Sequence, residues 1–306
     1  MRREFTAWLK AFATRDPKVV VLTGDLGFMA LEEVRAAIGE RFVNMGVSEQ
    51  NMISVAAGLA SEGLKPLCYS IAPFAVFRPA EQVRLDVCLH RLSVKIVGNG
   101  GGYGYGIMGA THHALEDVAV LSSFQGMSCF APVTGADVAA TADAMMAADG
   151  PGYLRLNAGQ LPEGHALASP FSPLRRITPP GGPAPAARLT VVGLGPIVLN
   201  ALAASPPAGA VDWFACSRLP LPSLDGQLRE SLARTGRLLV LEEHVERGGL
   251  AEHLALAVLR AGLAPRVWSR CAAGYPSKTY GSQKFHQQES GLDPDSLRAL
   301  LQDCLA

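Results

Sequence analysis

The chain has 306 residues, 49% of them hydrophobic, and its 27 Lys and Arg residues balance its 27 Asp and Glu residues. This length suffices for two domains with sizeable cores, and the neutral balance argues against nucleic acid or an anionic membrane surface as the main partner. The 6 cysteines are scattered without a C-x-x-C pair, which favours free thiols in a reducing compartment over disulfides or a zinc site. With no signal peptide and no membrane-length apolar run, we expect a cytoplasmic protein.

The first half of the chain alternates apolar strands with helices. After a basic helix within residues 1–16, buried strands are expected at 19–25, 42–46, 66–72, 93–100, 127–132 and 152–156. Helices are expected between them, near 30–39, 49–62, 78–90, 115–123 and 135–148. This alternation predicts a mostly parallel sheet covered on both faces, with ligands bound beyond the carboxyl ends of its strands.

A segment rich in Pro and Gly, residues 166–187, separates this half from a second α/β unit and predicts an extended linker, with the run 179–185 as a stiff spacer. In the second unit, buried strands are expected at 188–195, 210–217, 237–244 and 265–270, and helices near 196–205, 224–235, 248–261 and 294–305. The predicted fold class is therefore α/β, with domains at 1–165 and 188–306. Each domain is a mostly parallel sheet flanked by helices.

The glycine-rich stretch at 98–109, GNGGGYGYGIMG, contains G-x-G-x-x-G at Gly104, Gly106 and Gly109. A dinucleotide site would need a helix that opens at once and an acid at the end of the next strand, and neither follows. One alternative is a flexible surface turn. The other is a wall where the backbone approaches a flat ligand closely, which only glycine permits.

His112 and His113 follow this glycine-rich stretch. Adjacent side chains diverge, so the two cannot bind one metal together, and we expect no metal site in the chain. One interpretation is a capping or solvated histidine. The other is an imidazole at a helix start that handles protons or binds hydroxyls. Phe74 and Phe77, near the end of another strand, suit core packing as well as a site.

Glu49 begins the small-residue helix predicted at 49–62. Ser48 can cap this helix, and an anion in the first turn stabilises a helix by up to about 1 kcal/mol. However, Gly46 before it and the Ala-, Gly- and Val-rich helix after it imply burial, and a buried carboxylate needs a partner. No Lys or Arg lies within this segment, so a ligand is a candidate partner.

Three separated stretches resemble, in order and spacing, the pyrimidine-binding part of transketolases: GVSEQNM (46–52), SIAPFAVFRPAEQVR (70–84) and KIVGNGGGYGYGIMGATHHALED (95–117). The stretch LEEHVERGGLAEHL (241–254) is similar to the carboxy-terminal domain of the same superfamily, which includes deoxyxylulose-phosphate synthases. The resemblance covers essentially the whole chain and implies the thiamine diphosphate-binding fold. The G-D-G…N motif, with which a further transketolase domain binds the diphosphate and Mg²⁺, is not found. The chain therefore resembles the second subunit of a split transketolase.

This resemblance implies a role for each matching residue. Glu49 would hydrogen-bond the aminopyrimidine ring of thiamine diphosphate and favour the tautomer that removes the C2 proton, and His112 would face the reacting carbon and the donor hydroxyls. Glu49 and His112 are thus the implied catalytic residues. Further cofactor contacts are implied for Asp25, Phe74, Phe77 and Gly102, and substrate contacts for His112, His113, Tyr103, Tyr105 and Arg155.

The chain departs from the family pattern at several positions. Ala80 stands where many relatives carry an aromatic residue, Gly100 where ordinary transketolases have a second histidine, and Met108 where they have an acid that contacts donor hydroxyls. Arg155 is the nearest candidate for the arginine that grips a sugar phosphate. These departures argue against a pentose-phosphate substrate and favour two-carbon or acyl transfer to a specialised acceptor.

The resemblance implies the second subunit of a two-chain, thiamine diphosphate-dependent transferase that moves a two-carbon ketol or related acyl unit from a ketose-type donor. The Mg²⁺ ligands would lie on the partner subunit, and two copies of each chain would form an α2β2 heterotetramer. Two alternatives remain: the beta subunit of a 2-oxoacid decarboxylating or dehydrogenase enzyme, and a non-catalytic interaction subunit. The T-H-H and R-P-x-E-Q-x-R motifs favour the transketolase.

Overall fold

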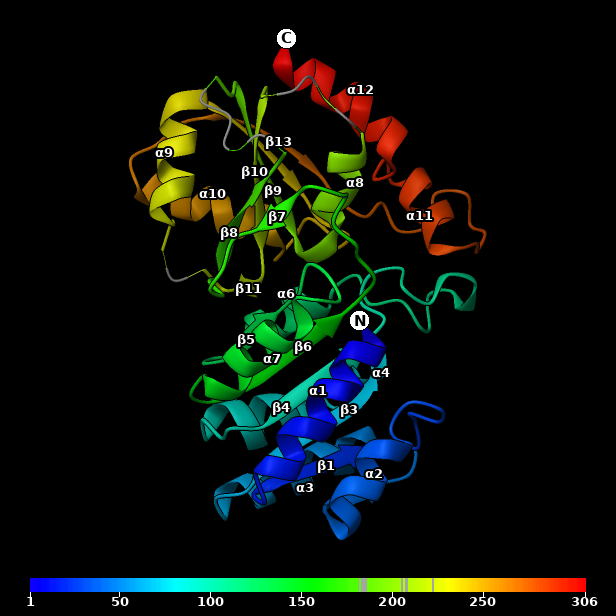
Figure 1. Cartoon of the computed structure of the whole chain (residues 1–306). Coiled ribbons are helices and arrows are strands. Elements are labelled where there is room, and N and C mark those ends of the chain that lie inside the picture. Colours follow the sequence, from blue (N-terminus) through cyan, green and yellow to red (C-terminus); the bar gives the residue numbers. More distant parts are fainter. Residues whose placement is uncertain (181, 183–185, 205, 207–208, 222) are drawn as a thin grey trace.

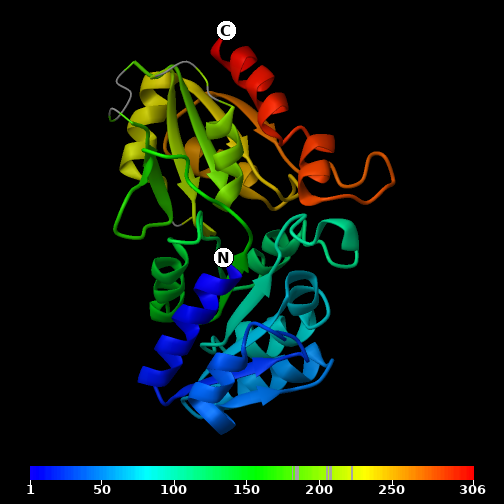
Figure 2. The ribbon, with the colours of Figure 1, turned by 45° about the vertical axis from the view of Figure 1, so that its right-hand side comes forward.

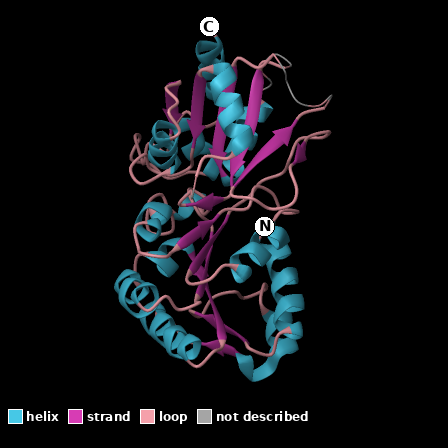
Figure 3. Ribbon diagram, turned by 90° about the vertical axis from the view of Figure 1, so that its left-hand side faces the viewer, coloured by secondary structure: helices cyan, strands magenta, loops and turns pink. Residues whose placement is uncertain are grey.

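Two α/β lobes are stacked on one another (Figure 1). The computed structural model describes residues 1–180, 182, 186–204, 206, 209–221 and 223–306. Helices cover both faces of the sheet in each lobe (Figure 3). The amino terminus lies close to the junction of the lobes, and the last helix lies at the far end of the second lobe (Figure 1). The predicted class, two sheets flanked by helices, is confirmed.

In the first lobe, helices or helical turns follow most of the strands. The strands are β1 (Val19–Thr23), β2 (Phe42–Asn44), β3 (Lys65–Ile71), β4 (Lys95–Asn99), β5 (Ser128–Phe130) and β6 (Gly152–Leu156). The helices are α1 (Arg2–Arg15), α2 (Glu32–Ile38), α3 (Glu49–Ser61), α4 (Ala72–Val76), α5 (Ala80–Gln82), α6 (Asp117–Ser122) and α7 (Val138–Ala147), with the helical turns η1 (Gly39–Arg41), η2 (Val83–Leu89) and η3 (Gly106–Met108). These six strands all pair in parallel, in the order β5-β6-β4-β3-β1-β2. Their carboxyl ends, and the loops that follow, therefore share one edge of the sheet.

The second lobe has a parallel centre with antiparallel strands at one side. Its strands are β7 (Ala166–Leu167), β8 (Leu174–Thr178), β9 (Leu189–Leu194), β10 (Val211–Cys216), β12 (Arg237–Leu241) and β13 (Arg266–Arg270). Its helices are α8 (Val198–Ala203), α9 (Gly226–Thr235), α10 (Leu250–Arg260), α11 (Gln283–Glu289) and α12 (Pro294–Leu305), with the turn η4 (Gly195–Ile197). The sheet order is β13-β12-β9-β10-β8-β7.

Part of the segment that we expected to be a linker belongs to the second sheet. β8 pairs antiparallel with β10, and Arg175 on β8 forms a buried ion pair with Asp137 of the first lobe, at 2.6 and 2.7 Å. The prediction of an extended linker at 166–187 is wrong for this stretch, because two consecutive arginines and nearby prolines mask the strand pattern. Most of the predicted stiff spacer at 179–185 lies outside the described residues.

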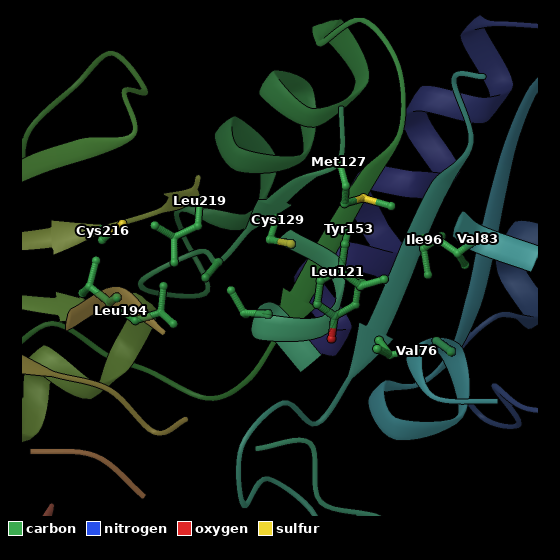
Figure 4. Close-up of a cluster of buried hydrophobic side chains, with 14 of the residues drawn as sticks. Val76, Val83, Ile96, Leu121, Met127, Cys129, Tyr153, Leu194, Cys216 and Leu219 are labelled. Carbon is green, nitrogen blue, oxygen red and sulfur yellow. The ribbon is translucent and has the colours of Figure 1, made fainter. Parts of the chain in front are cut away.

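One hydrophobic cluster spans the junction of the two lobes, beside further clusters that lie mainly in one lobe or the other. After β10 the chain returns to the first lobe as β11 (Arg218–Leu219), which pairs antiparallel with β5. Figure 4 shows buried side chains that run from Ile96 and Tyr153 of the first lobe to Leu194 and Leu219. The lobes are therefore joined through a shared apolar contact as well as through the chain.

Two of the predicted buried strands are edge strands. β2 and β13 end their respective sheets, and Val43 and Val267 on them are 36% and 47% exposed. The expectation of burial at 42–46 and 265–270 is wrong, because an apolar run indicates a strand without showing its position in the sheet.

The expectation of free thiols is confirmed. The cysteines form no disulfide, and all except the partly exposed Cys271 are buried. Throughout the described part of the chain, no helix has the length and hydropathy required to cross a membrane.

Candidate functional site

Three predicted site residues meet at the carboxyl edge of the first sheet. Glu49 opens α3 after β2, Phe74 lies on α4 after β3, and His112 lies in the loop after β4. The rings of Phe74 and His112 are 5.2 Å apart in an edge-to-face arrangement. Arg78 completes the group, because its Nη1 donates to Glu49 Oε2 at 3.0 Å and its guanidinium lies 4.0 Å from the centre of the Phe74 ring.

The Glu49 carboxylate is buried for a reason other than capping. The residue is 3% exposed, and Ser48 occupies the N-cap position of α3 as expected, although its side chain makes no capping hydrogen bond. Ser70 Oγ approaches the other carboxylate oxygen only at 3.4 Å. Within the described chain the main partner of Glu49 is Arg78, 29 residues further on. The residues around Glu49 in the sequence do not reveal this partner, because Arg78, in the turn between α4 and α5, reaches Glu49 only in the folded chain.

His112 faces the same side as Phe74. It is half-buried, its Nδ1 lies 2.9 Å from Thr111 Oγ1, and its ring centre lies 5.9 Å from that of Tyr105. The Tyr105 hydroxyl accepts a hydrogen bond from Asn99 Nδ2 at 2.8 Å, at the end of β4. The imidazole therefore has one polar neighbour in the turn and an aromatic wall on two sides, and it keeps a ring nitrogen for a ligand hydroxyl or proton.

His113 points the other way, as expected for adjacent side chains. It is buried, and its Nε2 lies 2.7 Å from the Gly106 carbonyl oxygen, which can only accept. Nε2 therefore carries the proton, and Nδ1 accepts from the Tyr275 hydroxyl at 2.9 Å. Burial lowers the pKa of His113. This side chain fastens the glycine-rich loop to the second lobe and does not face Glu49.

The glycine-rich loop approaches a protein side chain rather than an open cavity. Gly102 has φ +64°, and a Cβ there would lie 2.3 Å from Glu243 Oε1 of the second lobe. Glu243 accepts the backbone N–H of Tyr103 at 2.8 Å and the side-chain amide of Gln283 at 2.9 Å. Figure 2 shows α11 lying against this loop, which also contains η3. The close approach expected of glycine is present, and its partner is a carboxylate of the same chain.

Two further predicted contact residues are also engaged within the chain. The fully buried Tyr103 stacks on His286 at 4.9 Å and donates its hydroxyl to the Gly274 carbonyl. Arg155 is 3% exposed and donates to the Asp117 carboxylate at 2.8 Å. Both side chains are engaged with the second lobe, and Arg155 also borders a small pocket of about 30 Å³ beside Glu243 and Gln283.

Asp25 and Phe77 lie around the site. Asp25, exposed at the end of β1, exchanges hydrogen bonds with Asn44 at 3.0 and 2.8 Å and lines a cavity of about 190 Å³. The adjacent Gly24 borders Glu49, because a Cβ there would lie 3.3 Å from its Oε1. Phe77 is 38% exposed at the end of α4. The structure therefore brings Glu49, Phe74, Tyr105 and His112 together with Asp25 and Phe77 nearby, whereas Gly102, Tyr103, His113 and Arg155 face the second lobe.

Sequence reasoning missed Arg78, Glu243 and Tyr275. Arg78 stands four residues after Phe74, and this spacing places two side chains on one helical face. The spacing was the one feature of the sequence that could have indicated Arg78 as a site residue. Glu243 lies within the quoted LEEHVERGGLAEHL stretch, but its contact with Gly102 requires the packing of the two lobes.

The same stretch contains a buried acid and a buried imidazole with opposite shifts. Glu242 accepts the backbone N–H groups of Leu250 and Ala251 at the start of α10, yet burial raises its pKa to about 7. His244 Nε2 accepts the Ala119 N–H at 3.2 Å, and burial lowers the pKa of His244 to about 4. Between these values the folded chain holds a proton on Glu242 and none on His244, and the unfolded chain does the reverse. Burial of each group costs stability, but the Glu242 cost grows as the pH rises and the His244 cost grows as it falls, so their pH dependences nearly cancel.

Glu242→Gln should expose the contribution of His244. A lowered folded pKa gives stability that is present above the unfolded value and is lost as the pH falls towards the folded value. From pH 7 to pH 5 the variant should lose about 2 kcal/mol more unfolding free energy than the parent, measured by urea denaturation. Glu230→Gln, at an exposed carboxylate of α9, is the matched control and should follow the parent. Parallel pH curves for the parent and Glu242→Gln would rule out this account.

Residues 1–163 match the family model described as transketolase, pyrimidine binding domain. The chain therefore belongs to the transketolase family. It is 32% identical over 304 residues to a 1-deoxy-D-xylulose-5-phosphate synthase of Myxococcus xanthus, a match that covers 96% of this chain and 50% of that protein. It thus spans about half the length of that relative.

More specifically, the chain is similar to second subunits of split transketolases. It is 30% identical over 258 residues to one of the subunits of the apulose-4-phosphate transketolase of Phocaeicola vulgatus, a match that covers 81% of this chain and 80% of that protein. A structure described as a split gene transketolase, inactive beta4 tetramer, superimposes with a TM-score of 0.83 at 29% identity and covers 99% of this chain and 97% of that one. These relatives confirm that the chain is a second subunit of a transketolase-like enzyme.

Proposed function

We propose that this chain supplies the pyrimidine half of a thiamine diphosphate site in a two-chain transferase. The enzyme moves a two-carbon ketol unit, or a related acyl unit, from a ketose-type donor to an acceptor. The observation that carries this proposal is the Glu49 carboxylate, which is 3% exposed at the mouth of α3 and flanked by Phe74 and Arg78.

The residues present fit an aminopyrimidine. Such a ring is flat and carries hydrogen-bonding nitrogen at its edge, so it needs a buried carboxyl group beside an apolar face. Glu49 supplies the carboxyl group and Phe74 the face, while Gly24 leaves the space beside Glu49 Oε1 without a side chain. Asp25 and Phe77 are proposed to border the same ring.

The proposed division of work follows from position. When bound, thiamine diphosphate supplies the carbon nucleophile and the electron sink for breaking a carbon–carbon bond. Glu49 shares a proton with the ring nitrogen at the edge of the pyrimidine. His112 and Tyr105 lie on the neighbouring side and are proposed to bind donor hydroxyls, with His112 also moving a proton during cleavage. Phe74 keeps water from Glu49 and orients the ring.

The other half of the site is proposed to lie on a partner subunit that holds the diphosphate and Mg²⁺, within an α2β2 heterotetramer. The fit of the whole chain to a split transketolase subunit that forms a β4 tetramer supports self-association of this subunit type. We place the enzyme in the cytoplasm, where its free cysteines stay reduced.

Titration calorimetry with thiamine diphosphate and Mg²⁺ tests the proposal. The chain alone should bind more weakly than micromolar, because Mg²⁺ and diphosphate contacts contribute most of the charge-based affinity. Addition of the diphosphate-binding partner should bring the dissociation constant to micromolar or below. Micromolar binding by the isolated chain would contradict the division of the site.

Product analysis of the assembled enzyme distinguishes transketolase chemistry from 2-oxoacid chemistry. A ketose donor should yield a shortened aldose and an extended acceptor, whereas pyruvate should yield no carbon dioxide. Release of carbon dioxide from pyruvate without ketose turnover would favour the beta subunit of a 2-oxoacid enzyme.

A further inference from the structure

Arg78 makes with Glu49 and Phe74 the same two contacts that an aminopyrimidine would make. Its guanidinium is planar and lies 4.0 Å from the centre of the Phe74 ring, which is a stacking distance. Its Nη1 donates to Glu49 Oε2 at 3.0 Å. The proposed ligand is likewise a flat group with N–H at its edge, and it would stack on Phe74 and hydrogen-bond to Glu49.

We propose that Arg78 is an internal competitor for the pyrimidine site, closing over Glu49 and Phe74 when the site holds no ring and swinging out when a ring binds. The identity of the ring rests on the function proposed above. The competition itself rests on the shared contacts, because one carboxylate edge and one aromatic face cannot serve both groups at once.

The local sequence places Arg78 where it can either close over Glu49 and Phe74 or turn away from them. Phe74 lies on α4, and the chain stays helical through Phe77, so Phe74 and Arg78 share a face at the i, i+4 spacing. Pro79 follows, and its ring disfavours a helical conformation for the residue before it. Arg78 therefore lies in the short connection between α4 and α5, outside the rigid part of either helix.

Burial and exposure show which partner moves. The Glu49 side chain is 3% exposed and fixed at the start of α3, whereas the Arg78 side chain is 46% exposed. The bond to Glu49 is the only hydrogen bond of the Arg78 side chain to the described residues. The arginine can therefore turn into solvent at little cost, and the buried carboxylate then needs a replacement donor. The amino group of an aminopyrimidine, or its ring nitrogen once protonated, can donate that hydrogen bond.

The competition has a measurable consequence. If Arg78 covers the site nine times in ten, the apparent affinity for a ring is reduced about tenfold, because only the open fraction can bind. The probe is 4-amino-5-hydroxymethyl-2-methylpyrimidine, which lacks the diphosphate and so does not require the partner subunit. Its methyl proton signal is followed by NMR as the full chain is added, and thermal unfolding verifies that each variant is folded.

Arg78→Met, which keeps an apolar stem and removes the donor, should bind the probe about tenfold more tightly than the parent. Arg78→Lys, which keeps the charge without the planar group, should fall between the two. Arg84→Met makes the same substitution at an exposed arginine in η2 and should leave binding unchanged.

Equal or weaker binding by Arg78→Met would overturn the competition but not the pyrimidine site. Arg78 would then either have no effect on the ring or contribute to its binding. Absence of binding to the parent and to every variant would overturn the competition together with the proposed function. Glu49→Gln, tested alongside, should lose binding in the Arg78→Met background, because the carboxylate is the shared contact. Retained binding in that double variant would place the ring elsewhere and overturn the competition.

Discussion

Glu49→Gln is expected to slow C2 hydrogen–deuterium exchange of bound thiamine diphosphate at least a hundredfold in the assembled complex. An amide cannot exchange a proton with the pyrimidine nitrogen, and acid–base catalysis of this kind contributes about 10²–10⁴-fold. The fold should be nearly unaffected, because the amide oxygen still accepts from Arg78, and an ion pair with a half-exposed partner contributes at most about 1 kcal/mol. Chemistry and stability are therefore expected to respond very differently to one substitution.

The matched control is Glu62→Gln, at the exposed far end of α3. It removes the same charge from the same helix and should leave the exchange rate unchanged. If Glu49→Gln assembles, binds the cofactor and exchanges C2 deuterium at the parental rate, then Glu49 has only a structural role, and the proposed function loses its main support.

His112→Ala is expected to reduce the rate of donor cleavage by about 10²–10⁴-fold while cofactor affinity stays close to that of the parent. The imidazole contacts Phe74 in an edge-to-face arrangement, and Glu49 is paired with Arg78 instead, so removal of the imidazole should leave the proposed pyrimidine contacts in place. Single-turnover measurements with a ketose donor give the cleavage rate, and calorimetry of the assembled complex gives the affinity.

His90→Ala, at an exposed histidine after η2, is the control for this measurement and should behave as the parent. His112→Asn keeps a hydrogen-bond donor but cannot titrate, so it should restore donor binding without restoring the pH dependence of cleavage. Collapse of cofactor binding in His112→Ala would show that the turn is placed wrongly and that the histidine contacts the cofactor instead.

The periodicity of the chain was sufficient to predict the order of its main strands and helices. Long apolar runs such as the one that forms β9 are visible in any window, and the helix that begins at Glu49 has a clear start. Sheet order and edge positions could not be predicted this way, because they depend on partners far along the chain. β8 and β11 were missed for the same reason. β11 has only 2 residues, and arginines and prolines mask the pattern of β8, so each is recognisable only through its pairing with another strand.

Only those features of the candidate site that depend on single motifs could be predicted from the sequence. The short motifs placed Glu49, Phe74 and His112 after three parallel strands of one sheet, which is sufficient to bring them to one edge. Motif matching could not show that His113 and Tyr103 turn towards the second lobe, because their partners Tyr275 and Gly274 lie more than 160 residues away in the sequence. It also could not show that Arg78 holds the carboxylate.

The central claim is that Glu49 receives the pyrimidine ring. An experimental structure of the chain with its diphosphate-binding partner and thiamine diphosphate tests it most directly, through the distance from the Glu49 carboxylate to the nearest ring nitrogen. We predict a hydrogen bond of about 2.6–3.2 Å, with the ring packed against Phe74 and Arg78 turned away. A ring bound elsewhere, or an Arg78–Glu49 pair still closed beside a bound ring, would contradict the account.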